Sequence, residues 1–150
     1  MKKLSFKVRS GYRPDEIPRL REIERECFEF GVAWNLVEFK ENLPKAQVWV
    51  AETDDDVIGF LVAWVDRKVP HIASIDVASK RRGKGVASAL VAECERHFVE
   101  LGYDSITLLV HTDNPAQTLY FKLGYRAVKF YQNCEYGSMR KNMLKMQKAL

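Results

Sequence analysis

One stretch, residues 72–92, restricts the possible folds of this chain more than any other. It reads IASIDVASKRRGKGVASALVA and begins with a short apolar run typical of a buried strand. A basic loop with Gly83 and Gly85 follows, and then small and apolar residues at helical spacing. The first turn of a helix has unpaired backbone N–H groups, and the helix dipole attracts negative charge there. The pattern therefore predicts a strand, loop and helix that hold a phosphate-bearing ligand.

The N-terminal part predicts one strand followed by two helices. Apolar residues alternate with polar ones at 4–9, which indicates a half-buried strand. Asp15 is the expected N-cap of the first helix, with Pro18 in its first turn. Asn35 and Glu38 form a capping-box pattern at the start of the second helix. The apolar face of the first helix consists of Ile17, Leu20, Ile23, Cys27 and Phe28.

The rest of the chain alternates strands with two further helices. Residues 47–53 and 57–66 predict a β-hairpin with an acidic tip, and Pro70 is expected to break the chain before the next strand. The helix after the basic loop should end near Gly102, and Asn114 should cap a short helix that Gly124 closes. The other expected strands are 71–77, 105–111, 125–132 and 137–146.

Composition narrows the class of protein. The 150 residues, 47% of them hydrophobic, suffice for a single domain, 1–150, with its own core. No apolar run approaches the ~20 residues that span a bilayer, and no signal peptide is evident. The three cysteines and three histidines lack metal-ligand spacing, so we expect no metal and a reducing, cytoplasmic location. A net charge of +4 comes without a nucleic-acid-binding motif, so we expect neither a membrane nor a nucleic acid as partner.

Motifs around and after the basic loop complete a family pattern. Arg82, Gly85 and Ala87 match the sequence Arg/Gln-x-x-Gly-x-Gly/Ala, Asn114 follows the next strand, and Tyr120 lies in LYFKLGY. On these residues the chain resembles the GNAT N-acetyltransferase superfamily. The resemblance implies an α/β (α+β) fold with a mixed, mostly antiparallel sheet of about six or seven strands and about four helices. It also implies that the fourth and fifth strands splay apart.

Three segments are similar to the ribosomal-protein-alanine and archaeal N-terminal acetyltransferases. They are IERECF followed by a Trp-Asn turn, HIASIDV, and FYQNCEYGSM. The resemblance implies an enzyme that transfers an acetyl group from acetyl-CoA to a primary amine by direct attack in a ternary complex. The expected acceptor is a protein or peptide N-terminal α-amine, with ribosomal proteins among the candidates.

Two alternatives to this function stay open. One is acetylation of a small amine, such as a polyamine, an amino acid or an aminoglycoside. The other is a CoA-binding module without catalytic activity. The sequence leaves both monomer and homodimer open.

The resemblance also assigns residues to acetyl-CoA. The basic loop and its helix are expected to hold the pyrophosphate, and the fourth strand is expected to face the pantetheine. Tyr120 is the expected catalytic acid that protonates the leaving thiolate, since a phenol with a pKa near ~10 keeps its proton at neutral pH. The expected cofactor-binding residues are Ile75, Asp76, Val77, Arg82, Gly83, Lys84, Gly85, Val86, Ala87, Ser88, Asn114 and Tyr120.

The expected general base departs from the family pattern. Leu109 stands where the ribosomal-alanine type has a glutamate. His71, at the start of the fourth strand, is the expected catalytic base, because a histidine with a pKa near ~6.5 suits that role at neutral pH. His111, Glu26 and Asp76 are alternatives, and a chain of water molecules is another.

The acceptor is expected between residues 27–43 and the final strand pair. Aromatic side chains would line this site, and a glutamate would attract a cationic amine. The expected substrate-binding residues are Glu26, Phe28, Trp34 and Tyr131, with Phe30 and Tyr136 as further aromatic candidates.

Overall fold

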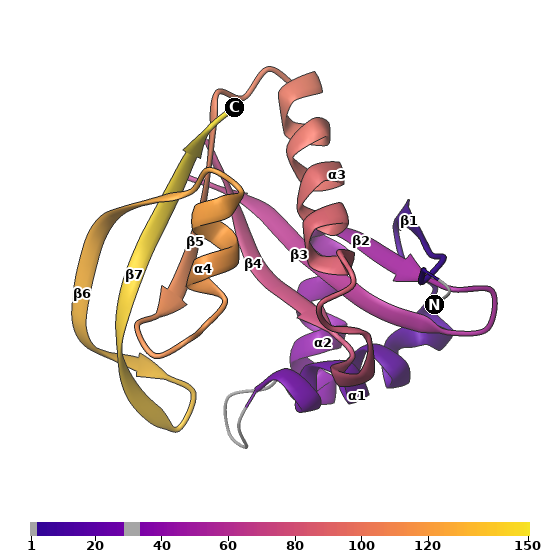
Figure 1. The fold of residues 1–150 in the computed structure, drawn as a ribbon. Coiled ribbons are helices and arrows are strands. Elements are labelled where there is room, and N and C mark those ends of the chain that lie inside the picture. Colours follow the sequence, from indigo (N-terminus) through magenta and orange to yellow (C-terminus); the bar gives the residue numbers. More distant parts are fainter. Residues whose placement is uncertain (1–2, 29–33) are drawn as a thin grey trace.

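The computed structural model describes residues 3–28 and 34–150, which form seven strands and four α-helices (Figure 1). The strands are β1 (Lys7–Ser10), β2 (Gln47–Glu52), β3 (Val57–Asp66), β4 (Val69–Val77), β5 (Ser105–His111), β6 (Arg126–Tyr136) and β7 (Met139–Ala149). The helices are α1 (Ile17–Cys27), α2 (Leu36–Asn42), α3 (Val86–Glu100) and α4 (Gln117–Lys122). The order of elements is the predicted one.

All seven strands belong to one mixed sheet, in the order β1-β2-β3-β4-β5-β7-β6. Only β4 and β5 pair in parallel, and every other neighbouring pair is antiparallel. Because β4 and β5 are parallel, the connection between them has to cross over, and α3 makes this crossover. The predicted mixed and mostly antiparallel fold is confirmed.

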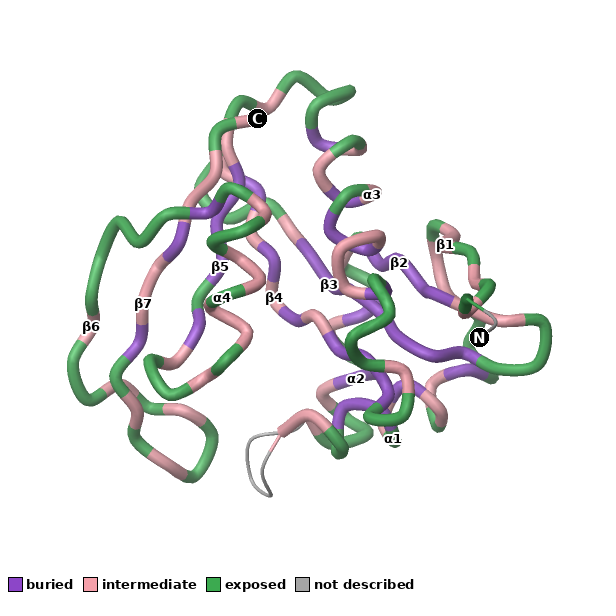
Figure 2. The backbone as a smooth tube through the Cα atoms, viewed as in Figure 1, coloured by how far each residue is buried: buried purple, intermediate pink, exposed green. Residues whose placement is uncertain are grey.

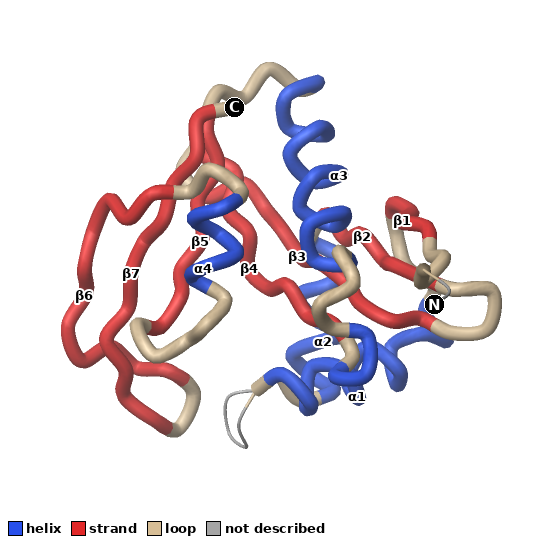
Figure 3. The backbone as a smooth tube through the Cα atoms, in the orientation of Figure 1, coloured by secondary structure: helices blue, strands red, loops and turns tan. Residues whose placement is uncertain are grey.

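Helices cover both faces of the sheet (Figures 1 and 3). On one face α1 and α2 bury Leu20, Ile23 and Phe39 against β2 and β3. On the other face α3 packs Leu90 and Phe98 against a second apolar cluster. Figure 2 shows the buried backbone concentrated in β2, β3, β4 and the inner side of α3, while most of β6 is exposed.

β4 and β5 pair over two residue positions and then part. The register joins His71 to Thr107 and Ile72 to Leu108, and it includes no pair beyond Ile72. The predicted splay is therefore confirmed among the described residues. Beyond Ile72 the edge of β4 that faces β5 has backbone N–H and C=O groups without a neighbouring strand.

A β-bulge at Ala73 changes the direction of the β4 side chains. Val62 pairs with Ser74 and the adjacent Ala63 pairs with Ile72, so Ala73 is an extra residue in β4. A bulge re-aims the side chains that follow it. Ile75 therefore joins the same apolar cluster as Ile72, three positions earlier. Ser74, between them, lies on the face that α1 covers.

Local predictions at helix ends are partly right. The Asn35–Glu38 capping box is present, with Glu38 N–H donating to Asn35 Oδ1 at 2.9 Å and Asn35 N–H donating to Glu38 Oε1 at 3.2 Å. Gly102 and Gly124 end their helices with φ of 90° and 100°, as predicted.

Other local predictions were wrong. Asp15 does not cap α1, because a 3-10 turn at Pro14–Glu16 precedes the helix. Pro70 lies inside β4, opposite Val65. The chain instead turns at Arg67 and Lys68, whose positive φ values suit a tight hairpin.

The described residues contain no helix that is both long enough and apolar enough to span a bilayer.

Candidate active site

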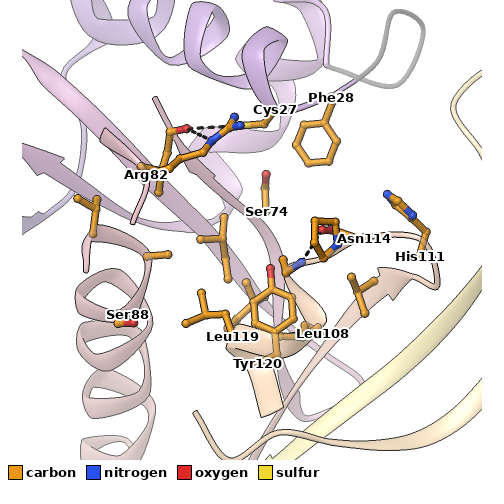
Figure 4. A pocket seen from close by; sticks show the side chains of 18 of the residues that line it. Cys27, Phe28, Ser74, Arg82, Ser88, Leu108, His111, Asn114, Leu119 and Tyr120 are labelled. Carbon is orange, nitrogen blue, oxygen red and sulfur yellow. Dashed lines mark hydrogen bonds between the residues drawn. The ribbon is translucent and has the colours of Figure 1, made fainter. Parts of the chain in front are cut away.

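A cavity of about 580 Å³ lies where β4 and β5 part. Its wall comes from the C-terminal end of α1, from β4, from the basic loop with the start of α3, from β5, and from α4, β6 and β7 (Figure 4). Elements from both halves of the chain therefore meet at one hollow, as the sequence predicted for the loop, Asn114 and Tyr120.

The N-terminus of α3 opens onto this cavity without a side-chain cap. Gly85 is the N-cap residue, with φ of 84°, and Gly83 has φ of 72°. Within residues 3–28 and 34–150, no side chain bonds to the first-turn N–H groups. A Cβ on either glycine would meet no atom within 4 Å, so a ligand can lie close to the backbone. Unpaired N–H groups at the positive end of a 15-residue helix are suited to an anion such as phosphate.

Arg82 ties the loop to α1 at the edge of the cavity. Its Nε donates to Val77 O at 3.3 Å, and its Nη2 lies 3.3 Å from both Glu26 O and Cys27 Sγ. Arg81 also lines the cavity. Lys84 does not, because it turns to a shallow hollow beside residues 3–6.

Tyr120 points its hydroxyl into the cavity from α4 (Figure 4). Burial raises the pKa of this phenol to about 12, and the negative charge of Asp76 adds to the effect. Tyr120 therefore holds its proton at neutral pH and can donate it. Asn114 also lines the cavity, while its Oδ1 accepts a hydrogen bond from Ala116 N at 2.9 Å. The helix itself starts three residues later than Asn114, at Gln117.

Two buried carboxyl groups lie behind this wall. Asp76 is 0% exposed and Glu24 is 3% exposed. Burial raises the pKa of Asp76 to about 7, against the effects of a hydrogen bond from Ser74 and the charge of Arg82. Burial and the charge of Asp76 raise the pKa of Glu24 to about 8, although Trp34 N donates to its Oε2 at 2.9 Å. Asp76 does not line the cavity, so the structure does not bring it to the cofactor surface as predicted.

His71 lies away from the cavity, at the end where β4 and β5 still pair. Its Nδ1 is 2.9 Å from Thr107 Oγ1. Burial and the charge of Lys145 lower its pKa, and Asp66 acts in the opposite direction. The described geometry therefore does not place His71 with Tyr120, which argues against its predicted role as the base.

Three of the predicted substrate-binding residues also lie outside the cavity lining. Trp34 stacks on Trp64 with ring centroids 6.5 Å apart and belongs to the core under α2. Glu26 accepts a hydrogen bond from Ser79 N at 3.1 Å. Tyr131 sits on β6 beside Lys129. Phe28 does line the cavity, whereas Phe30 lies outside the described residues.

The sequence reasoning missed Ser74 and Cys27, which both line the cavity. In a regular strand, Ile72 and Ser74 would point to the same face of the sheet. Because of the bulge at Ala73 they point to opposite faces, which the sequence did not indicate. His111, an alternative base, does line the cavity, and its Nδ1 is buried without a partner among the described residues. Tyr136 lies against it, with ring centroids 5.3 Å apart.

Comparison with known proteins decides the family. Residues 17–125 match the model of the acetyltransferase (GNAT) family. The chain belongs to this family. An uncharacterized N-acetyltransferase of Methanocaldococcus jannaschii is 29% identical over 126 residues, which cover 80% of this chain and 81% of that protein. N-acetyltransferase 8F1 of Rattus norvegicus is 32% identical over 85 residues, which cover 52% of this chain and 38% of that protein.

Solved structures of low identity share the fold. The ribosomal-protein-S18-alanine N-acetyltransferase of Escherichia coli has a TM-score of 0.83 at 18% identity, covering 97% of this chain and 94% of that one. Ard1 of Thermoplasma volcanium has a TM-score of 0.83 at 21% identity, with coverage of 98% and 99%. A Bacillus subtilis acetyltransferase in complex with CoA has a TM-score of 0.77 at 20% identity, with coverage of 97% and 99%.

As a GNAT acetyltransferase, the protein is an enzyme that uses acetyl-CoA for N-acetylation. The cavity fits this cofactor on two observations. The uncapped start of α3 offers N–H groups to a pyrophosphate, and the parted edge of β4 offers backbone groups to the amides of a pantetheine arm.

We expect Gly85→Ala to weaken acetyl-CoA binding by about tenfold, or ~1.4 kcal/mol. The added Cβ disfavours the left-handed backbone at the start of α3 by roughly 1–2 kcal/mol and so misaligns the first-turn N–H groups. Titration calorimetry measures the change. Gly102→Ala is the matched control, because Gly102 has φ of 90° at the other end of α3. Equal loss of affinity in both variants would refute the assignment of the pyrophosphate site to the start of α3.

Because Asp76 and Glu24 are buried carboxyl groups, we expect the protein to lose stability as pH rises. Their pKa values rise from 3.8 to about 7 for Asp76 and from 4.5 to about 8 for Glu24, so the folded state holds these protons more tightly than the unfolded state. The free energy of unfolding should therefore fall between about pH 4 and pH 8. Asp76→Asn should stabilise the protein by about 1 kcal/mol or more at pH 8 and by less at pH 5, as measured by thermal unfolding. An equal effect at both pH values would contradict this.

Proposed function

We propose that the protein acetylates the N-terminal α-amine of a protein or peptide, by direct attack of the amine on acetyl-CoA in a ternary complex. The observation that carries the proposal is one continuous cavity between the parted strands. The uncapped start of α3 lies on one side of it, and the Tyr120 hydroxyl points into it. Bound acetyl-CoA supplies the activated acetyl thioester.

In this proposal the chain holds the cofactor mainly through its backbone. The N–H groups of Val86, Ala87 and Ser88 would hold the pyrophosphate, and Gly83 and Gly85 let it approach. The side chain of Arg82 adds positive charge at the same edge. Its bonds to Val77 and to the end of α1 also fix the position of the loop against β4.

The unpaired edge of β4 would position the thioester. Ile75 and Val77 line the cavity, and in the part of the chain that the structure describes their strand has no partner strand on the β5 side beyond Ile72. A fixed backbone N–H aimed at the thioester oxygen stabilises the negative charge that develops there. Tyr120, protonated at neutral pH, would donate its proton to the leaving sulfur.

The charge of the wall favours a peptide over a polycationic small molecule. Among the described residues, the cavity lining contains the cations Arg81 and Arg82 and no carboxylate. A polyamine or an aminoglycoside carries several positive charges that would find no counter-charge here. A peptide brings one amine and a backbone that needs hydrogen bonds and apolar contacts, and Phe28 and Tyr136 provide aromatic surface for them. One protein of the same fold, the Escherichia coli enzyme, acts on a ribosomal-protein alanine, whereas another, from Bacillus cereus, is an IAA acetyltransferase.

The direct test offers the enzyme acetyl-CoA with two sets of acceptors. One set consists of peptides that have a free N-terminus, each paired with the same peptide blocked at its N-terminus. The other set contains polyamines, amino acids and aminoglycosides. We expect CoA release with free peptides alone. Turnover confined to the small amines would overturn the proposal, and binding of acetyl-CoA without any turnover would favour the CoA-binding module.

Tyr120→Phe should lower kcat by about 10²-fold, because it removes the proton donor for the leaving thiolate. The dissociation constant of acetyl-CoA should change by less than about twofold, since the ring stays in place. Tyr125→Phe is the matched control. Its ring lies 6.3 Å from that of Tyr120, but its hydroxyl donates to the half-buried Glu95 of α3. An unchanged kcat in Tyr120→Phe would remove Tyr120 from the acid role.

A further inference from the structure

β4 carries two neighbouring polar side chains on its α1 face. Ser74 Oγ donates a hydrogen bond to Asp76 Oδ2 at 2.9 Å, and both residues are buried. Ser74 lines the cavity, and Figure 4 shows it across from the Tyr120 hydroxyl. Asp76 lies behind it, and its Oδ1 has no hydrogen-bond partner among the described residues.

This arrangement is costly for stability. A buried carboxylate without full pairing costs several kcal/mol, and an apolar side chain of similar size would avoid that cost. Arg82 is the cation that acts on Asp76, yet its hydrogen bonds go to Val77 O, Glu26 O and Cys27 Sγ. Asp76 Oδ1 can therefore still accept a hydrogen bond. The Ser74 hydroxyl connects Asp76 to the cavity and could pass a proton between them.

We propose that Ser74 and Asp76 form the proton relay that deprotonates the acceptor amine. Ser74 is the catalytic residue that touches the ammonium group, and Asp76 acts through it as the positioned proton acceptor. The inference rests on the proposed transfer to an amine and names the residues that prepare this amine for attack.

In this relay, proton transfer precedes the attack on the thioester. The ammonium N–H gives its proton to Ser74 Oγ while the Ser74 hydroxyl proton moves to Asp76 Oδ2. The neutral amine then uses its lone pair to form the C–N bond as the C–S bond breaks, and the electron pair of that bond leaves on sulfur. The second amine proton passes to solvent as the amide forms, and Tyr120 gives its proton to the sulfur. Solvent then returns a proton to Tyr120 and takes up the one held by Asp76, so that one proton is released in each turnover.

The groups around Asp76 suit this role. Glu24 and Cys27 face it from α1, Arg82 from the loop and Tyr120 from α4. The pKa of about 7 lets Asp76 accept a proton near neutral pH. The pKa of Glu24 is about 8, so Glu24 is still largely protonated when Asp76 ionises.

Asp76 couples deprotonation of the acceptor amine to protonation of the leaving thiolate. Its negative charge contributes to the raised pKa of Tyr120. When Asp76 takes up the proton of the amine, this charge disappears and Tyr120 becomes a stronger acid. The phenol thus becomes more acidic at the point where the thiolate needs a proton.

The test is the pH dependence of kcat at saturating peptide and acetyl-CoA. Wild-type kcat should fall as pH drops below about 7, because protonated Asp76 accepts no proton. Asp76→Asn should lower the plateau, which is the maximal kcat reached above about pH 7, by about 10²-fold. It should also remove the fall in kcat at low pH, the acid limb of the profile. Ser74→Ala should act in the same direction, and Ser74→Thr, which keeps the hydroxyl, should recover most of the rate.

Two measurements and two further variants separate the relay from a structural role. Thermal unfolding and the dissociation constant of acetyl-CoA should show that each variant is folded and binds cofactor. Glu24→Gln removes the other buried carboxyl, which lies outside the cavity lining, and should keep both plateau and limb. His111→Gln should keep the acid limb, although His111 lines the cavity.

The outcomes are distinct. If the wild type is active and Asp76→Asn keeps the acid limb, the relay is overturned while the proposed function stands. Loss of the limb in His111→Gln would assign the base to His111 and also overturn the relay. A wild type that turns over no amine would instead overturn the proposed function, and the relay would fall with it. A full rate in Ser74→Ala would contradict the relay even if Asp76→Asn failed to fold.

Discussion

The parting of β4 from β5 after two residue pairs is the constraint on which the rest of the site depends. A parallel pair normally continues its ladder, and buried backbone groups without partners are costly. Here the strands diverge beyond Ile72, and the space between them becomes the cavity. The uncapped start of α3 and the free edge of β4 then present N–H groups toward the same cavity. A cofactor with phosphate at one end and amides along its arm matches both sets of groups.

The bulge at Ala73 changes the face of the sheet to which the following β4 side chains point. Ile75 and Val77 pack toward α3 and line the cavity, whereas Ser74 and Asp76 turn toward α1. In the proposed mechanism, one strand thereby serves the cofactor along its edge and the acceptor through its side chains. The same residues explain why stability and activity should respond oppositely to Asp76→Asn: the buried carboxyl destabilises the fold above neutral pH and is the proposed proton acceptor there.

Features that depend on local chemistry were predictable from the sequence. The capping box at Asn35, the glycines that end α3 and α4, and the loop at Gly83 and Gly85 follow from the backbone preferences of short segments. The family motifs added the mixed sheet and the splay. The same motifs led to the expectation that Tyr120 and the loop serve one site, and both line one cavity. Features that depend on a partner strand were not predictable. The bulge at Ala73 exists only in the register with β3, and Trp34 is drawn into the core by Trp64.

We propose that acetyl-CoA lies between the parted strands with its phosphates at the start of α3. Amide hydrogen exchange followed by NMR, with and without acetyl-CoA, tests it at the level of single N–H groups. We expect new protection at the amides of residues 75–77 and 86–88, and little change at His71 and Ile72, where β4 already pairs with β5. Protection confined to the hollow beside residues 3–6 and Lys84 would contradict the account.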